Sequence, residues 1–435
     1  MGSYVPNSME ERQEMLEFLG LSNIDELFNN VPDEVKLDKL NIPSGKSEME
    51  VYKAFKKMAG KNKVFGSIFR GAGSYNHYIP SVVKAVASKE RFVTAYTPYQ
   101  PEISQGILQA IFEYQTIICE LTGMDASNAS VYDGASAAAE AAAMCADNKR
   151  KKILVSATSK PDTIETIKTY SHVAGNEVVV IPAKNGETDM ESLKAQLDDA
   201  ACFYVEMPNY NGIIEDYDAL GEVIHGAGGK FIMGANPMAL SIFKTPADFG
   251  ADIAVGEAQP LGMPMSFGGP YLGYMACKAA MTRKLPGRIV GETTDSNGKR
   301  AFVLTLQARE QHIRRDKASS NVCSNQALCA FTSVVYVGAM GSNGMENVAS
   351  QCYSKAHYAA DEISKIKGFD LEYNKNFFNE FVTKCPVDTN ALMEKLEEND
   401  ILGGLPVEGG ILWCVTEMNS KEEIDRLCEI LREVA

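Results

Sequence analysis

The sequence has 435 residues, of which 45% are hydrophobic and 23% charged, and a formal net charge of −15. This composition is typical of a soluble globular protein, and the length predicts one large domain plus a smaller one. The acidic balance argues against a nucleic-acid partner, because phosphate binding needs a basic surface. No apolar run approaches the ~18 residues that would cross a membrane, and the polar N-terminus reads as neither a signal nor a transit peptide. We therefore expect a cytoplasmic protein without a membrane segment.

Cysteine and histidine are dispersed along the chain. The ten cysteines and five histidines include no CxxC pair and no spacing typical of a zinc site. Buried, reduced thiols and the absence of a metal site are the expectation.

The first 70 residues are predicted to form an N-terminal helical arm. Arg12, Leu16 and Leu19, followed by Gly20, indicate a short helix, and residues 22–28 indicate a second one. A proline- and glycine-marked stretch at 42–45 then leads toward the core.

Residues 71–330 alternate short apolar runs with amphipathic segments, which predicts a large α/β domain. Apolar runs of this length, separated by helices, favour a mostly parallel seven-stranded sheet covered on both faces. The expected strands lie at 130–132, 152–156, 177–181, 202–206, 231–233, 253–255 and 272–277. Helices are expected at 136–145, 161–173, 190–196 and 217–225.

Residues 331–435 are predicted to form a smaller α+β domain. A helix at 327–337 leads through a glycine-marked stretch at 338–344 into a long helix at 345–366. A strand at 380–385, a helix at 388–398 and a strand at 410–416 follow. Ser420 and Glu423 have the spacing of a capping box and predict the start of the last helix.

A strand-to-helix turn at 132–140 is the first candidate site. Free backbone N–H groups at a helix N-terminus suit a phosphate, and small side chains let the anion approach. Gly134, Ala135 and Ser136 would supply this vestigial phosphate site. A plain turn whose alanines pack on the sheet explains the same residues.

Two positions lack the residues that a pyridoxal-phosphate (PLP) enzyme of the aminotransferase fold needs. In that fold the loop after the strand at 253–255 carries the lysine that forms the Schiff base, and here Gln259 stands in its place. An aspartate that pairs with the pyridine nitrogen would follow the strand at 231–233, where this chain has Gly234. Both absences argue against a cofactor bound covalently to this chain. An imine through Lys244 or Lys278 is the alternative.

Polar aromatic and carboxamide side chains are concentrated between residues 75 and 105. Such groups can line a pocket, donate and accept hydrogen bonds and exclude water. A subunit-interface loop is the alternative, and both descriptions can hold together. The residues are Tyr75, Asn76, His77, Tyr78, Tyr96, Tyr99, Gln100, Glu102, Ser104 and Gln105.

Residues 283–317 carry nine Lys or Arg and four Asp or Glu, a local positive excess in an acidic chain. Arg309, Arg314 and Arg315 could hold a carboxylate or dock an acidic protein. A solvated helix face with internal ion pairs is the alternative.

Several long motifs resemble the glycine-cleavage P-protein family, glycine dehydrogenase (decarboxylating), and in particular subunit 1 of its split, two-chain form. They are YNHYIPSVV, TAYTPYQPEISQG, YDGASAAAEAAAM, FGGPYLG, LPGRIVGET and QAREQHIRRDKASSN. The resemblance runs almost end to end. It implies the fold type I, aminotransferase-like architecture for the large domain.

The resemblance also implies a function and partners. PLP is expected on the lysine-bearing subunit 2, in a heterotetramer of two plus two chains. Together they would decarboxylate glycine, release CO2 and pass the aminomethyl group to the lipoyl disulfide of H-protein. This chain would complete the pocket across the interface with Tyr96 and Tyr99, near Tyr75, Asn76, His77, Gln100, Ser104 and Gln105. Arg309, Arg314 and Arg315 would face the glycine carboxylate or H-protein.

One position departs from the pattern of active PLP enzymes. They tend to carry a ring-stacking histidine or aromatic residue after the strand at 152–156, where this chain has Lys160. Two other functions stay open: an autonomous PLP decarboxylase or aminotransferase that uses another lysine, and a scaffold subunit that contributes nothing to the chemistry.

Overall fold

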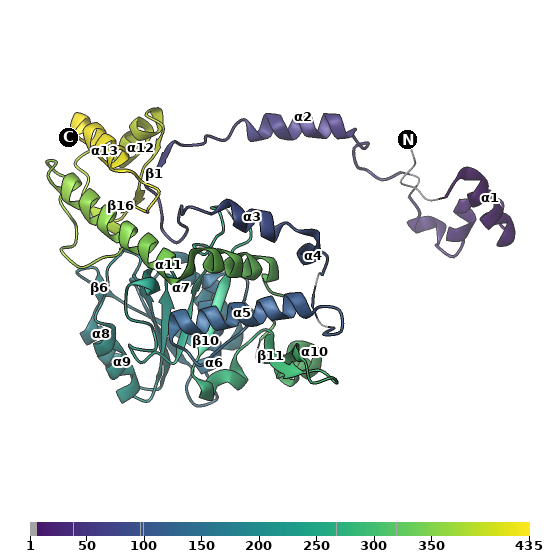
Figure 1. The fold of residues 1–435 in the computed structure, drawn as a ribbon, viewed down its shortest axis with the longest axis horizontal. Helices are drawn as coiled ribbons and strands as arrows, with labels where there is room; N and C mark the ends of the chain where they lie inside the picture. The colour runs from purple at the N-terminus through teal and green to yellow at the C-terminus, as the bar shows by residue number, and fades with distance from the viewer. Residues whose placement is uncertain (1–6, 38, 96, 99, 267, 319) are drawn as a thin grey trace. The chain divides into compact units, whose positions relative to one another are not determined.

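The computed structural model describes residues 7–37, 39–95, 97–98, 100–266, 268–318 and 320–435. The chain divides into two compact units, Met1–Val64 and Phe65–Ala435 (Figure 1). No helix in the described part of the chain combines the length and the apolar character needed to cross a membrane.

The N-terminal unit consists of short helices. Helix α1 (Met9–Phe18) and helix α2 (Glu48–Ala59) each begin at a serine that forms a capping box with a glutamate three residues later. The segment at 22–28, expected as a helix, forms a 3-10 helix over Ile24–Phe28, and another spans Asp33–Val35. Helix α2 was not predicted. None of the described residues of this unit has a buried side chain.

The larger unit is built on a seven-stranded sheet, as predicted. Strands β9, β8, β7, β3 and β4 run parallel, and β10 is antiparallel to both of its neighbours. The spatial order is β2 (Ala126–Ser127), β10 (Gly273–Cys277), β9 (Ile253–Glu257), β8 (Lys230–Ala235), β7 (Ala200–Met207), β3 (Lys152–Ser156) and β4 (Glu177–Ile181).

Both faces of the sheet are buried, which explains why its strands read as nearly continuous apolar runs. On one face Leu154 and Phe203 join a core that includes α5, α9 and α11. On the other face Ile153, Val155 and Cys202 pack against α6 and α7. The helices of the larger unit up to this point are α3 (Ser81–Ala87), α4 (Glu90–Val93), α5 (Gln105–Thr122), α6 (Gly134–Cys145), α7 (Pro161–Ala174), α8 (Met190–Ala195) and α9 (Tyr217–Gly226).

The strand predicted at 130–132 is wrong. Val131 forms only an isolated bridge with Gly273, and the edge strand β2 comes earlier in the chain. The backbone of Ser130 has a φ of 118°, which an extended strand cannot contain. The strands predicted at 152–156 and 177–181 have the observed bounds of β3 and β4.

Helix α5 supports a hairpin that the sequence did not reveal. The hairpin joins β11 (Ile289–Thr294) to β12 (Arg300–Thr305). Two amides on α5 pair with its backbone. Gln115 donates to the Val290 carbonyl and accepts from the Val290 N–H, both at 2.9 Å. Gln105 makes the same two bonds with Phe302, at 2.9 Å each.

Replacing Gln115 with leucine is expected to lower the free energy of unfolding by about 2–4 kcal/mol, because two buried backbone groups lose their partners. Urea denaturation followed by circular dichroism would measure the change. Gln109 is the matched control, since it lies exposed on the same helix and bonds only to Glu113. Its replacement by leucine should change stability by less than about 0.5 kcal/mol. Equal effects of the two substitutions would refute the supporting role of Gln115.

The C-terminal part forms its own core around a three-stranded sheet of order β13-β16-β15. Helix α11 (Ala327–Ser364) leads into this core. Its backbone is non-helical at Gly341, which has a φ of 64° and lies in the glycine-rich stretch predicted to separate two helices. Because α11 crosses residue 330, the domain boundary there stays a prediction. The remaining elements are β13 (Glu380–Thr383), α12 (Thr389–Glu398), β14 (Ile401–Leu402), β15 (Leu405–Val407), β16 (Gly410–Cys414) and α13 (Lys421–Val434).

Short elements complete the unit. Strand β1 (Ser67–Ile68) pairs in parallel with β14, and so ties the beginning of the unit to its end. A small hairpin consists of β5 (Ala183–Lys184) and β6 (Glu187–Thr188). Helix α10 (Gln311–Arg314) follows the β11–β12 hairpin in the chain (Figure 1). The capping box predicted for the last helix is present between Ser420 and Glu423.

Candidate functional site

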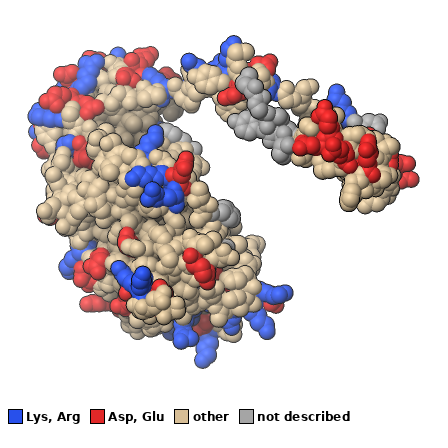
Figure 2. Space-filling model, turned by 45° about the vertical axis from the view of Figure 1, so that its right-hand side comes forward, with Lys and Arg blue, Asp and Glu red and all other residues tan. Residues whose placement is uncertain are grey.

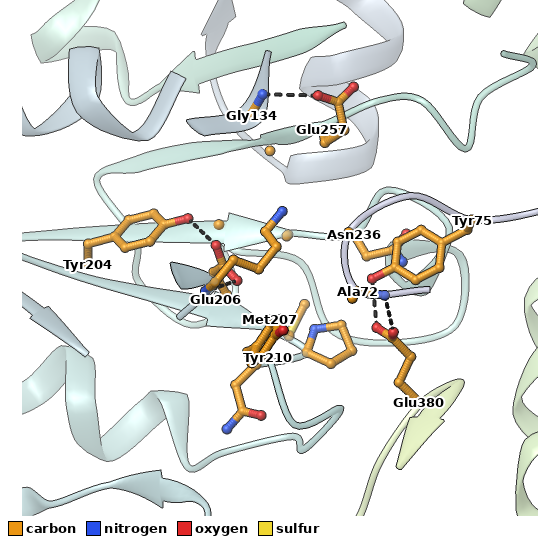
Figure 3. Close-up of a pocket in the computed structure, with 17 residues that line it drawn as sticks. Ala72, Tyr75, Gly134, Tyr204, Glu206, Met207, Tyr210, Asn236, Glu257 and Glu380 are labelled. Atoms are coloured by element: carbon orange, nitrogen blue, oxygen red, sulfur yellow. Dashed lines mark hydrogen bonds between the residues drawn. The ribbon is translucent and has the colours of Figure 1, made fainter. Parts of the chain in front are cut away.

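A polar pocket lies where the parallel strands of the large sheet end. The carboxyl ends of β7, β8 and β9, the loop after β3 and the start of α6 all contribute to it, as does Glu380 of β13 (Figure 3). Strand β3 has β4 on one side and β7 on the other, so the strand order reverses at β3. Open α/β sheets bind ligands at such topological switch points.

One lysine and three glutamates line this pocket. They are Lys160, Glu206, Glu257 and Glu380. We call these four residues the charged cluster. The Lys160 side chain packs against Gly73, where a Cβ would lie 3.0 Å from its Cδ and the φ is +112°. Glu206 accepts from the Tyr204 hydroxyl at 2.9 Å and from the backbone N–H of Lys160 at 3.1 Å.

Glu257 occupies the helix N-terminus at which we expected a phosphate. Its carboxylate accepts from the N–H of Gly134 at 3.1 Å, in the first turn of α6 (Figure 3). The N–H groups of Gln259 and Leu272 also donate to it, at 3.0 and 2.8 Å. The N–H of Ser136 donates to the Asp133 side chain at 2.7 Å. Two carboxylates therefore already use the dipole of this helix, and both would repel a phosphate.

Glu380 closes the opposite side of the pocket. It accepts from the backbone N–H of Ala72 at 2.6 Å and from the Tyr75 hydroxyl at 2.7 Å. Figure 3 shows both donors pointing at its carboxylate. The small sheet that carries Glu380 is thereby connected to the 72–75 loop.

Burial and mutual attraction set the proton affinities of the charged cluster. Burial raises the pKa of the carboxyls of Glu257 and Glu380, against the hydrogen bonds that they accept. Burial acts to lower the pKa of Lys160, but the surrounding carboxylates, Glu206 foremost, outweigh it and raise that pKa above its usual value. Burial also holds the pKa of Tyr75 well above its ordinary range. The cluster thus keeps its lysine charged.

Gln259 is fully buried and its carboxamide is fixed by three hydrogen bonds. It accepts from the N–H of Tyr75 and donates to the carbonyl of Tyr75, both at 2.9 Å, and it also donates to the Met263 carbonyl at 2.7 Å. The amide that we predicted to replace a Schiff-base lysine therefore links its loop to the 72–75 loop.

Gly234 leaves no room for the aspartate of a PLP enzyme. A Cβ at this position would lie 2.4 Å from the hydroxyl oxygen of Tyr204 and 3.0 Å from Cγ of Glu206. The space open to a water-sized molecule in the pocket is about 40 Å³. This volume holds about three water molecules and no coenzyme with a ring and a phosphate. The residues of this pocket do not fit PLP.

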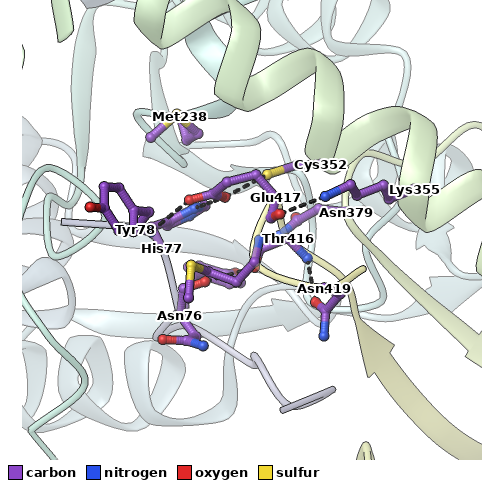
Figure 4. Close-up of polar contacts among 12 residues, drawn as sticks. Asn76, His77, Tyr78, Met238, Cys352, Lys355, Asn379, Thr416, Glu417 and Asn419 are labelled. Carbon is purple, nitrogen blue, oxygen red and sulfur yellow. Dashed lines mark hydrogen bonds and ion pairs between the residues drawn. The ribbon is translucent and has the colours of Figure 1, made fainter. Parts of the chain in front are cut away.

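The predicted residues Asn76 and His77 belong to a second, hydrogen-bonded cluster (Figure 4). Nδ1 of the buried His77 lies 2.7 Å from Oε2 of Glu417, and the Asn76 carbonyl accepts from the Thr416 hydroxyl at 2.7 Å. Cys352 Sγ lies 3.4 Å from the same Glu417 oxygen. The thiol, imidazole and carboxylate lie within 4.8 Å of one another, as metal ligands do. The 2.7 Å contact is that of a hydrogen bond, so we assign a structural network.

The other residues predicted for the aromatic pocket lie near the start of α5. Ser104 is the buried N-cap residue of α5, and its N–H donates to the carbonyl of the exposed Gln100 at 3.1 Å. Gln105 is engaged with the backbone of β12. Tyr96 and Tyr99 lie outside the described residues. The predicted set is thus divided among the pocket, the Glu417 cluster and the start of α5.

The three predicted arginines have different surroundings. Arg309 donates to the carbonyls of Leu285 and Gly287, the latter at 2.6 Å, and holds this backbone in place. Arg314 and Arg315 are exposed. We predicted that Arg309 binds a ligand, but its guanidinium group already donates hydrogen bonds to these two backbone carbonyls.

Neither alternative lysine lies in the pocket. Lys278 donates to the Gly250 carbonyl at 2.8 Å, and Lys244 lies 3.4 Å from the Asp218 carboxylate on the surface. Neither is among the residues that line the pocket.

Sequence reasoning missed the three glutamates of the charged cluster. Glu206 and Glu257 each end an apolar strand, and this was the available signal, because parallel strands present their carboxyl ends at one edge. Glu380 carried no such signal, since it comes from the other sheet. Lys160 was noticed only as a departure from the pattern of PLP enzymes.

Comparisons with known proteins give one family over nearly the whole chain. Residues 2–431 match the family described as "Glycine cleavage system P-protein". The "Probable glycine dehydrogenase (decarboxylating) subunit 1" of Desulfitobacterium hafniense is 46% identical, over 99% of this chain and 100% of its own. A crystal structure of glycine decarboxylase (P-protein) of the glycine cleavage system, in inhibitor-bound form, has a TM-score of 0.94 and 39% identity over 100% of both chains.

A more distant structure shares the fold alone. The glutamate decarboxylase of Lactobacillus brevis has a TM-score of 0.69 at 12% identity, over 94% of this chain and 96% of its own. The aminotransferase-like α/β architecture expected from the sequence is confirmed. The chain belongs to the glycine cleavage system P-protein family.

Proposed function

We propose that this chain is the lysine-free subunit of a two-chain glycine dehydrogenase (decarboxylating). With a lysine-bearing subunit 2 it decarboxylates glycine, releases CO2 and transfers the aminomethyl group to the lipoyl group of H-protein. The observation that carries the proposal is Gln259, a buried carboxamide fixed by three hydrogen bonds at the position of the missing amine. PLP, which supplies the electron sink, is held by the partner.

The exposed apolar surface of the N-terminal unit supports a partner chain. Phe18 is 90% exposed, and Leu37 and Val64 are similarly uncovered. Large exposed apolar areas are typical of surfaces that another chain covers. Figure 2 shows that the visible face of the larger unit also has wide areas without charged side chains. A heterotetramer of two plus two chains would cover such surfaces.

We further propose that the loop before α5 completes the partner's pocket. Tyr96 and Tyr99 would be wall and positioning residues, with Gln100 and Ser104 beside them. Gln105 acts indirectly, because its amide fixes this loop to β12. Hydroxyl and amide groups held in place in this way hold a small substrate in one orientation and exclude water.

Arg314 and Arg315 are the proposed contacts for the acidic H-protein. Their exposed guanidinium groups can meet carboxylates of a partner, whereas the guanidinium of Arg309 is engaged with backbone carbonyls. Arg309 would keep the basic segment in place.

Exchange of the glycine carboxyl group with labelled bicarbonate tests the function. The mixture of this chain with the lysine-bearing subunit should form a heterotetramer in light-scattering chromatography and catalyse exchange when H-protein is present. Each chain alone should do neither. A PLP absorbance band on the isolated chain that borohydride fixes to one of its own lysines would contradict the proposal and favour an autonomous PLP enzyme.

Tyr96→Phe and Tyr99→Phe separate a pocket role from a scaffold role. If the hydroxyls position the substrate, exchange should fall by about 10- to 100-fold while the heterotetramer still forms. Unchanged exchange and assembly in both variants would favour the scaffold.

A further inference from the structure

The pocket of the charged cluster contains hydrogen-bond donors without acceptors. The Nζ of Lys160 makes no hydrogen bond or ion pair with any residue in the described part of the chain. Asn236 also lines the pocket, and its buried Nδ2 has no partner among the described residues. Buried donors are nearly always paired in native proteins, so the unpaired Nδ2 of Asn236 indicates a missing acceptor in this cavity. The half-buried ammonium group of Lys160 lines the same pocket and is open to the same acceptor.

The same pocket offers acceptors that are only partly used. The carboxylates of Glu206 and Glu380 each accept two hydrogen bonds from the protein. An ionised carboxylate has about four acceptor positions. With Glu257, the pocket has three carboxylates and one ammonium group. A cationic donor would balance this excess.

The size of the pocket limits the ligand. A space of about 40 Å³ holds about three water molecules. Glycine and alanine are of this size, whereas amino acids with longer side chains are not. The wall is close-packed at two of its glycines, because a Cβ at Gly234 would lie 2.4 Å from the Tyr204 hydroxyl oxygen and one at Gly134 would lie 2.9 Å from the Glu257 nitrogen.

We propose that this pocket binds a small α-amino acid in its zwitterionic form, with the carboxylate on Lys160 and Asn236 and the ammonium group on Glu206 and Glu380. An anion alone would meet three carboxylates. A simple cation would leave the two donors unpaired. A zwitterion satisfies both sets of groups at once. This site is separate from the proposed catalytic pocket, which needs the partner chain.

Isothermal titration calorimetry on the full isolated chain, without PLP or partner, tests the proposal. Glycine and alanine should each bind at one site, with a dissociation constant between about 10 µM and 10 mM, the range open to so small a ligand. Acetate and methylammonium, which each carry one of the two charges, should bind at least about tenfold more weakly. No saturable heat with glycine would overturn the proposal, and so would equal binding of acetate or methylammonium.

Two substitutions locate the site. Glu206→Gln and Lys160→Met should each weaken glycine binding at least about tenfold, because each removes one charged partner. If Lys160→Met fails to fold, the double variant with Glu206→Gln keeps the charge balance and should also lose binding. Glu191→Gln is the control, since Glu191 is exposed and pairs only with Lys194. Undiminished binding in both pocket variants would place the ligand elsewhere and refute the assignment. The exchange assay can fail or succeed independently of this result.

Discussion

Replacing Gly234 with aspartate is expected to prevent stable folding, although it restores the residue that PLP enzymes carry at this point. The new Cβ would lie 2.4 Å from the Tyr204 hydroxyl oxygen, which donates to Glu206 at 2.9 Å. The side chain must therefore displace this pair and add a fourth carboxylate to the buried cluster. Overpacking and an unpaired buried charge together cost about 4–6 kcal/mol.

Thermal unfolding would measure this effect. We expect the Tm to fall by about 4–8 °C, or no folded protein to be recovered. Gly106→Asp is the matched control. Gly106 lies in the first turn of α5, where a Cβ meets no atom within 4 Å and an acidic group suits the helix dipole. Its Tm should stay within about 2 °C of wild type. A Gly234→Asp chain as stable as this control would refute the packing described around Tyr204.

Replacing Lys160 with methionine is expected to destabilise the chain strongly at pH 8 and much less at pH 5. The three carboxylates that line the pocket would lose its lysine, whose charge favours their ionised form from beyond contact distance. Such a charge shifts the pKa of a nearby carboxyl by about 1–3 units, or about 1.4–4 kcal/mol. The pKa values of Glu257 and Glu380, already raised by burial, would rise further.

The sign of the pH dependence follows from these directions. A carboxyl whose pKa is higher in the folded than in the unfolded chain costs stability in full above the folded pKa. This cost disappears as the pH falls from the folded to the unfolded pKa. The difference from wild type should therefore shrink toward pH 5. Lys160 itself has a raised pKa, so its contribution in wild type is complete below the ordinary lysine range and constant between pH 5 and 8.

Urea denaturation at both pH values would measure the difference. Adding Glu206→Gln to Lys160→Met should recover part of the loss, which a double-mutant cycle would quantify. Lys168→Met is the control, because Lys168 lies exposed on α7 and its pair with Glu165 is worth less than about 1 kcal/mol. An equal loss at pH 5 and pH 8 would show that Lys160 acts through packing and not through charge.

The fold could be predicted where the local pattern agreed with the final environment. Strands β3 and β4 are buried between two helical layers, so their apolar runs had the right length and clear ends. The β11–β12 hairpin was missed because its apolar contacts, such as Phe302 and Val290 with Leu108, join segments far apart in the sequence. The glycines predicted a break between two helices, and the non-helical backbone of Gly341 confirms that two helical segments meet there.

Only the residue types that the candidate site lacks could be predicted from the sequence. Gln259 and Gly234 could be found because a residue type was missing at a known place. The charged cluster joins residues 160, 206, 257 and 380, and only the folded chain brings these positions together. Lys160 looked like a departure in the sequence, and its meaning became clear once three carboxylates were found around it. Charged residues so far apart in the sequence leave no local sequence pattern that would pair them.

The carboxylate of Glu257 on the first turn of α6 also has an evolutionary consequence. Binding a pyridoxal coenzyme covalently would require removal of this carboxylate, a lysine at 259, an aspartate at 234 and more space beside Tyr204. Each of these changes alone would disrupt hydrogen bonds or packing that the present pocket depends on, and none alone would restore activity. Covalent coenzyme binding by this chain is therefore hard to reach by stepwise mutation.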